Sequence, residues 1–362
     1  LIGIFFFLWT VQVKENHELE SLNGIGKSIT DKDTLKSLVG QNFHKVLLSF
    51  PTFGLVLFTI LPLIVMILVA FTNYSSTYMN PKHLFDWVGM YNFKTLFGLT
   101  NVGGDDFVAV FARIMLWTLI WAIFATFTNY FFGMIVAMLI NRKGIRLKKI
   151  WRTILVTTIA VPQFISLLFL SKLLAENGGI NSLLLKWGWI SSPIGFLDDA
   201  LTAKITIIVV NMWIGIPYTM LMCSGILMNI PADLYESARI DGASPFKMYM
   251  KITLPYMLFV TGPYLISNFV GNINNFNVIY LLSGGNPMFT NINGNLIDTS
   301  KVYSAGQTDL LITWLYKMVM TSTNKEYGVA SVIGIVIFII LATVSSIVYG
   351  RTNAVKNEGD FQ

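Results

Sequence analysis

Charged residues, cysteine and histidine are all scarce in this chain. Only 12% of its 362 residues are charged, which is about half the share that soluble domains usually carry. The single cysteine, Cys223, excludes a disulfide within the chain. The histidines (His17, His44 and His83) are scattered and have no ligand-like partners, so we expect neither a metal site nor a cofactor. A chain this poor in charge is not expected to fold as a water-soluble domain.

Apolar residues, in contrast, are abundant and are grouped in long runs. They make up 54% of the chain, and the mean hydropathy is +0.63. A helix that spans a bilayer needs roughly 17–25 such residues. Seven runs reach or approach this length: 1–13, 51–72, 113–140, 153–174, 204–229, 257–282 and 327–349. We therefore predict an all-α, polytopic membrane protein. Because 1–13 is short and begins with Leu1, we expect a further helix upstream.

The basic residues are distributed unevenly among the connecting loops. Loops 14–50, 141–152, 230–256 and 350–362 contain 16 of the 25 lysines and arginines, whereas loops 73–112, 175–203 and 283–326 contain 6. Because short cytoplasmic loops carry an excess of lysine and arginine, the first set, including the C-terminus, is predicted to be cytoplasmic. The net charge of +6 then reflects topology, and no basic stripe with stacking aromatics indicates a nucleic-acid partner.

These observations predict three parts of the chain. Residues 1–50 would hold a partial span and an amphipathic cytoplasmic segment, 51–349 the transmembrane domain, and 350–362 a cytoplasmic tail.

The polar loop 230–256 is the most informative segment. Pro231 suits the first turn of a helix, and Asp233 complements the positive end of that helix. Gly242 is predicted to end the helix, and Ser244 followed by Pro245 to start another. The loop would present a helix–turn–helix knob to the cytoplasm. The alternative is an ordinary amphipathic loop between two membrane helices.

The spacing Glu-x-Ala-x3-Gly-x9-Ile-x-Leu-Pro in this loop resembles the EAA signature of permease subunits in ATP-binding-cassette (ABC) importers. The resemblance implies a type I importer transmembrane domain whose loop docks in a cleft of a separate ATPase. The residues matched to that role are Glu236, Ser237, Ala238, Arg239, Asp241 and Gly242. Ser237 replaces the alanine of the signature, which is a change from one small residue to another.

Further motifs are similar to the F-type permease subunit of maltose and maltodextrin importers. They are Phe71-Thr72-Asn73-Tyr74, Phe85-Asp86-Trp87-Val88-Gly89, Ala160-Val161-Pro162, the run from Asn211 to Tyr218, and Asn274-Asn275-Phe276. The similarity implies a heterodimer with a second homologous permease, two ATPase subunits and an extracellular sugar-binding protein. The connection beginning at Asn73 lacks the large globular insert of Gram-negative subunits. This resembles Gram-positive relatives, whose binding protein is lipid-anchored, and implies a bacterial plasma membrane.

Amide side chains are concentrated in the 257–282 run. Asn268, Asn272 and Asn275 follow the i, i+4, i+7 rule and would share one face of a helix. Polar groups inside membrane helices usually face the bundle interior or a cavity, and amides supply the donors and acceptors that sugar hydroxyls need. The alternative is hydrogen bonding between helices, but three amides on one face favour a lined cavity.

Two other runs carry similar features. Asn211 and Gly215 lie one turn apart, and Pro162 is predicted to kink the 153–174 run beside Gln163. The family resemblance implies that Gln163, Asn211, Ile214, Gly215, Asn268, Asn272 and Asn275 line the sugar site, with Ile159 standing where the maltose subunit has an aromatic residue. Trp213 and Tyr218 are further candidates.

The predicted function is that of a non-catalytic permease subunit for maltodextrin-like oligosaccharides. A galacto-oligosaccharide is the alternative substrate within the same class. An ion-coupled secondary transporter would need acidic residues or histidine at mid-membrane depth, whereas the 19 acidic residues fall in loops or at span edges. An integral-membrane enzyme is disfavoured by the lack of reactive groups, and peptide or phosphate permeases by the uncharged amides. Gly24-Ile25-Gly26-Lys27-Ser28 lacks the first glycine of a phosphate-binding loop, so the chain itself is not expected to bind ATP.

Overall fold

The computed structural model describes residues 9, 13, 14, 17, 40, 43–79, 83–99, 104–142, 144–292 and 294–351. The chain divides into two units, Leu1–Met66 and Ile67–Gln362. Most of the predicted 1–13 span, most of the amphipathic segment up to residue 50, and the tail from 352 onward lie outside the described residues.

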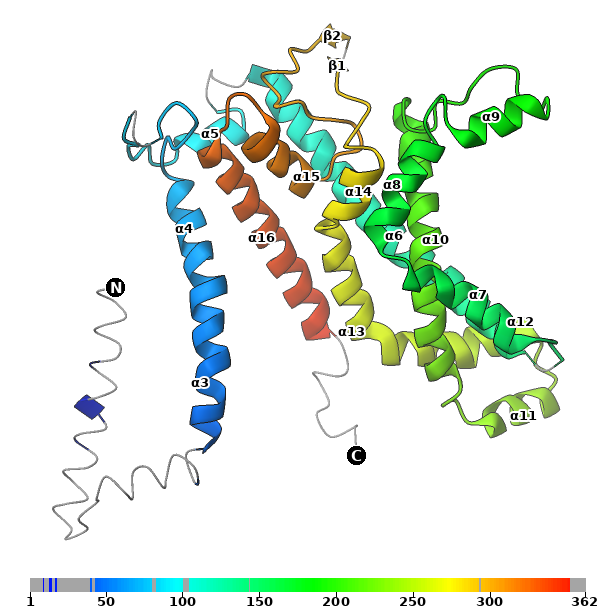
Figure 1. Cartoon of the computed structure of the whole chain (residues 1–362). Coiled ribbons are helices and arrows are strands. Elements are labelled where there is room, and N and C mark those ends of the chain that lie inside the picture. The colour runs from blue at the N-terminus through cyan, green and yellow to red at the C-terminus, as the bar shows by residue number, and fades with distance from the viewer. Residues whose placement is uncertain are drawn as a thin grey trace. The chain divides into compact units, whose positions relative to one another are not determined.

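Helices make up nearly all of the described regular structure (Figure 1). In chain order they are α3 (Phe43–Leu55), η1 (Val56–Ile60), α4 (Leu61–Val69), α5 (Tyr91–Leu96), α6 (Gly104–Asn141), α7 (Lys148–Ala160), α8 (Gln163–Leu173), α9 (Gly179–Lys186), α10 (Ala200–Leu227), α11 (Ala232–Ile240), α12 (Pro245–Met248), η2 (Tyr249–Thr253), α13 (Leu254–Ile273), α14 (Phe276–Leu282), α15 (Leu311–Tyr316), η3 (Lys317–Thr321) and α16 (Tyr327–Arg351). One short hairpin pairs β1 (Asn291–Ile292) with β2 (Asn295–Leu296) in antiparallel register.

Four of the described helices are long and apolar enough to cross a membrane: Val46–Val69, Asp105–Asn141, Ala200–Leu227 and Tyr327–Ile347. They match four of the predicted spans. The predicted 153–174 span consists of α7 and α8, which are bent by 90° where Pro162 follows Val161. The predicted kink at Pro162 is therefore confirmed, and so is the all-α membrane architecture.

The predicted 257–282 span is not one continuous helix, which corrects the expectation from the sequence. α13 ends at Ile273, and α14 begins at Phe276. The side chain of Asn275 accepts a hydrogen bond from the backbone N–H of Val278 at 3.3 Å, and so acts as the N-cap of α14. Asparagine is a strong N-cap residue because its oxygen pairs with an otherwise unpaired N–H of the first turn.

Small residues allow α6 and α10 to pack closely. A Cβ at Gly133 on α6 would lie 2.7 Å from Cβ of Thr219 on α10. A Cβ at Gly215 on α10 would lie 2.6 Å from Cγ of Asn129 on α6. Glycine at these two positions therefore leaves room for Thr219 and for the amide of Asn129 between the two helices.

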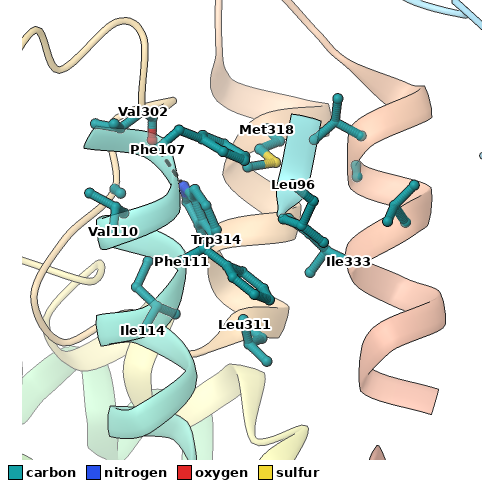
Figure 2. Packing of buried hydrophobic residues seen from close by; sticks show 14 of the residues in the cluster. Leu96, Phe107, Val110, Phe111, Ile114, Val302, Leu311, Trp314, Met318 and Ile333 are labelled. Carbon is teal, nitrogen blue, oxygen red and sulfur yellow. Dashed lines mark hydrogen bonds between the residues drawn. The ribbon is translucent and has the colours of Figure 1, made fainter. Parts of the chain in front are cut away.

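A second packed region joins the beginning of α6 to α15 and α16 (Figure 2). Trp314 is fully buried among Phe107, Phe111 and Met318, and its Nε1 donates to the carbonyl of Val302 at 2.9 Å. Trp314 lies on the short helix α15, within the 283–326 loop. This core fixes the 283–326 loop against the membrane helices.

Candidate functional site

A cavity of about 560 Å³ lies among α6, α10, α13 and the bend between α7 and α8. This volume falls within the roughly 300–1,000 Å³ of small-molecule sites. Its lining residues are Asn129, Thr158, Ile159, Ala160, Val161, Pro162, Gln163, Ser166, Asn211, Trp213, Ile214, Gly215, Tyr218, Thr219, Tyr264, Ser267, Asn268 and Asn272. None of them is charged, whereas amides, hydroxyls and aromatic rings are all present.

The cavity brings together most of the residues that the sequence singled out. Six of the seven predicted sugar-site residues line it: Gln163, Asn211, Ile214, Gly215, Asn268 and Asn272. Ile159, Trp213 and Tyr218 line it as well. Asn275 is not among the lining residues; it lies beyond the end of α13 and caps α14.

The amides of Asn268, Asn272 and Asn275 form a continuous hydrogen-bonded chain. Asn275 Nδ2 donates to Asn272 Oδ1 at 3.3 Å, and Asn272 Nδ2 donates to Asn268 Oδ1 at 2.9 Å. Asn268 Nδ2 in turn donates to Tyr264 Oη at 3.0 Å. Each member holds the next in place, so these polar groups are oriented before any ligand arrives.

Asn272 also links α13 to α6. Its Nδ2 donates to Thr126 Oγ1 at 3.0 Å, and its backbone carbonyl accepts from Trp121 Nε1 at 3.1 Å. Asn272 therefore both lines the cavity and connects two helices.

Sequence reasoning missed several polar lining residues. They are Asn129, Thr158, Ser166, Thr219, Tyr264 and Ser267. Asn129 is the most notable, because the sequence contained a signal for it: Thr126, Asn129 and Gly133 recur at i, i+3 and i+7 on α6. This stripe of polar and small residues faces α10 and α13.

The 230–256 loop adopts the predicted helix–turn–helix form. Pro231 precedes α11, and Gly242 has a φ of +73° directly after it, a left-handed conformation that glycine adopts without strain. Ser244 caps α12 by accepting from the N–H of Lys247 at 3.3 Å, and Pro245 occupies the first turn.

Most of the knob is exposed. Ile240 is 86% exposed and Phe246 is 73% exposed. The residues matched to the EAA signature, Glu236 to Gly242, lie on α11 and the turn after it, and only Ala238 among them is partly covered. The loop is tied to the helix that follows it by a 2.8 Å hydrogen bond between Tyr235 Oη and Thr253 Oγ1.

Known proteins resemble this chain in both sequence and fold. Residues 129–354 match the family described as binding-protein-dependent transport system inner membrane component. The maltodextrin transport system permease protein MalC of Streptococcus pneumoniae is 33% identical over 98% of this chain and 80% of its own length. The galactooligosaccharides transport system permease protein GanP of Bacillus subtilis is 32% identical over 96% of this chain and 77% of its own.

Among solved structures, a chain of a bacterial alginate ABC transporter in complex with a periplasmic protein matches 90% of this chain and 97% of its own, with a TM-score of 0.65 and 19% identity. At that identity the match concerns the fold alone. It agrees with the helical architecture described above. The chain belongs to the inner membrane components of binding-protein-dependent transport systems, the permease subunits of ABC importers.

Proposed function

We propose that this chain forms part of the path by which maltodextrin-like oligosaccharides are imported, and that the cavity among α6, α10 and α13 is its sugar site. The observation that carries the proposal is the chemistry of the cavity wall. It offers amides and hydroxyls without a single charged side chain. Such a wall suits a ligand that is polar and uncharged.

Sugar hydroxyls both donate and accept hydrogen bonds, and so do the amides of Asn268, Asn272 and Gln163. Trp213 and Tyr218 are 48% and 58% exposed, so their rings are open to the apolar face of a sugar ring. Peptides, phosphate and other ionic substrates would meet no counter-charge on this wall. The cavity also has no carboxylate or histidine that could couple transport to protons or cations.

The relatives favour maltodextrin over the alternative. The maltodextrin permease matches slightly more of both chains than the galactooligosaccharide permease does. Ile159, 41% exposed at the cavity wall, offers an aliphatic surface where the maltose subunit has an aromatic ring. This difference affects stacking at one point of the site and leaves the amide wall unchanged.

The partners follow from the family and from the exposed knob. We expect a second homologous permease, two ATPase subunits, one of which receives Glu236 to Gly242, and an extracellular binding protein that is lipid-anchored. The connection 73–112 is only about 40 residues long, too short for a globular domain, which supports a Gram-positive plasma membrane. The C-terminus would lie in the cytoplasm together with the knob. The chain itself would be non-catalytic, with ATP hydrolysis in the separate subunits.

A direct connection between the knob and the cavity supports coupling of the ATPase subunits to the sugar site. Tyr235 on α11 is hydrogen-bonded to Thr253 at the end of η2, and η2 leads without interruption into α13. α13 carries Tyr264, Asn268 and Asn272 into the cavity wall. A movement of α11, driven by closure of the ATPases, would therefore shift the wall of the sugar site and change the side to which it opens.

Reconstitution tests this function. The chain is co-expressed with the second permease, ATPase and binding protein and placed in proteoliposomes, and uptake of labelled maltotriose is measured with and without internal ATP. We expect uptake that requires both ATP and the binding protein. Uptake driven by an ion gradient without ATP would overturn the proposal, and preferential uptake of galactotriose would replace its substrate.

A further inference from the structure

Two buried amide groups in the cavity wall each have one atom without a hydrogen-bond partner. Asn129 on α6 is 6% exposed, and its Oδ1 is unpartnered; Asn211 on α10 is 5% exposed, and its Nδ2 is unpartnered. Among the described residues, only Asn141 and Ser322 share this condition, and neither lines the cavity. Buried polar atoms nearly always have partners, so each exception indicates a specific role. Here one free acceptor and one free donor belong to the wall of the same cavity.

The setting of Asn129 allows it to reach a ligand. Its amide lies against Gly215, with Cγ 2.6 Å from the place where a Cβ would stand. The last torsion of an asparagine side chain is soft, so the amide can turn from the α6–α10 contact toward the cavity that Asn129 lines. A hydroxyl placed there can donate to Asn129 Oδ1 while it accepts from Asn211 Nδ2.

We propose that Asn129 is a further specificity-determining residue, which pairs with Asn211 to hold one hydroxyl of the transported sugar. The inference rests on the proposed function and adds α6 to the elements that recognise the ligand. A site built around a hydroxyl rejects analogues without it, because its buried polar groups are then left unpaired. Asn129 and Asn211 would thus make the importer sensitive to the presence of one particular hydroxyl.

The first experiment compares Asn129→Leu with wild type in the reconstituted complex. The transport KM is measured for maltotriose and for a panel of monodeoxy maltotrioses. We expect the KM for maltotriose to rise about threefold to tenfold, the worth of one neutral hydrogen bond. One deoxy analogue should be transported with the same KM by both complexes, because it lacks the hydroxyl that Asn129 contacts. The wild-type and variant complexes use the same binding protein, so its own sugar preferences affect both KM values equally.

Asn141→Leu is the matched control. Asn141 lies on the same helix and also has a buried unpartnered amide nitrogen, but it does not line the cavity. Its substitution should leave the KM for every sugar unchanged. An unchanged KM in Asn129→Leu, or an equal rise for maltotriose and all its deoxy analogues, would show that Asn129 only packs α6 against α10 and would overturn the inference.

A second measurement covers the case in which Asn129→Leu does not assemble. Because Cys223 is the only cysteine of the chain, Asn129→Cys in a Cys223→Ser background gives a unique reporter thiol. Labelling of this chain by a small methanethiosulfonate should occur and should be slowed by maltotriose, whereas Asn141→Cys should not be protected. No labelling, or labelling indifferent to sugar, would overturn the inference. Failure of the wild-type complex to transport any oligosaccharide would instead reject the proposed function.

Discussion

The amide of Asn129 on α6 occupies the space that a side chain at residue 215 of α10 would fill. A Cβ there would lie 2.6 Å from Asn129 Cγ and 2.9 Å from its Oδ1. Family resemblance alone gives Gly215 a place in the sugar site. The structure adds a physical reason for glycine, because the absence of a side chain lets a polar group from another helix enter the cavity wall.

Gly215→Ala is therefore expected to impair transport although it adds one methyl group. The methyl would displace Asn129 or separate α6 from α10, and overpacking of this kind costs about 1–3 kcal/mol. The purified complex should melt at a lower temperature, and its transport KM should rise. Gly225→Ala on the same helix is the control, because nothing lies within 4 Å of a Cβ there. Equal behaviour of the two variants would contradict the packing role.

A feature of the fold or the site could be predicted from the sequence when a single residue or its near neighbours determine it. The bend at Pro162 and the turn at Gly242 follow from the backbone restrictions of single residues, so they were predictable. The place of Asn275 was not, because the i, i+4, i+7 rule assumes an unbroken helix, and the helix ends at Ile273. Asn129 was missed because its importance depends on Gly215, which is distant in sequence and close only once α6 and α10 pack.

Asn272 and Asn275 should respond differently to the same substitution. Asn272→Asp removes the Nδ2 that donates to Thr126 and Asn268 and places a carboxylate beside Asn268 Oδ1. Buried groups left unpaired cost about 1–3 kcal/mol each, so transport should be lost. Asn275→Asp keeps the oxygen that caps α14, and aspartate caps as well as asparagine. It loses only the single, longer hydrogen bond from Nδ2 to Asn272 Oδ1 at 3.3 Å, so transport should fall but should not be lost.

Uptake of maltotriose by cells that express the complex distinguishes the two variants, with membrane levels of the chain as the control for assembly. If Asn275→Asp abolished uptake at normal membrane levels, Asn275 would contact the sugar directly as well as cap α14.

Substitutions at Gly242 can distinguish two reasons for a glycine there: docking against the ATPase and the backbone conformation of the turn. Nothing lies within 4 Å of a Cβ at this position in the free chain, but the φ of +73° is unfavourable for most residues. Asparagine tolerates this conformation better than other residues do, so Gly242→Asn should preserve the turn while it adds bulk to the docking surface. We expect Gly242→Asn to insert normally and yet lose transport and copurification with the ATPase. Normal transport by this variant would mean that only the turn requires glycine.

Lys317 and Asp309 form a buried ion pair whose loss should unfold the 283–326 loop. Their Nζ and Oδ2 atoms are 2.7 Å apart, and the side chain of Asp309 is completely buried. Asp309 also accepts from the N–H of Gly306 at 2.7 Å and from Thr313 Oγ1 at 2.9 Å. One carboxylate therefore joins the part of the loop that precedes α15 to α15 itself. Asp309→Leu would leave the ammonium of Lys317 buried without a counter-charge, which typically costs about 3–5 kcal/mol.

The double variant Asp309→Leu/Lys317→Met tests whether the charge itself is responsible. Replacing both members of a buried pair by apolar residues is often neutral, so the double variant should recover much of the melting temperature that Asp309→Leu loses. The remaining deficit should reflect the hydrogen bonds to Gly306 and Thr313, which neither apolar residue can accept. A double variant no more stable than Asp309→Leu would assign the stabilisation to those hydrogen bonds rather than to the ion pair.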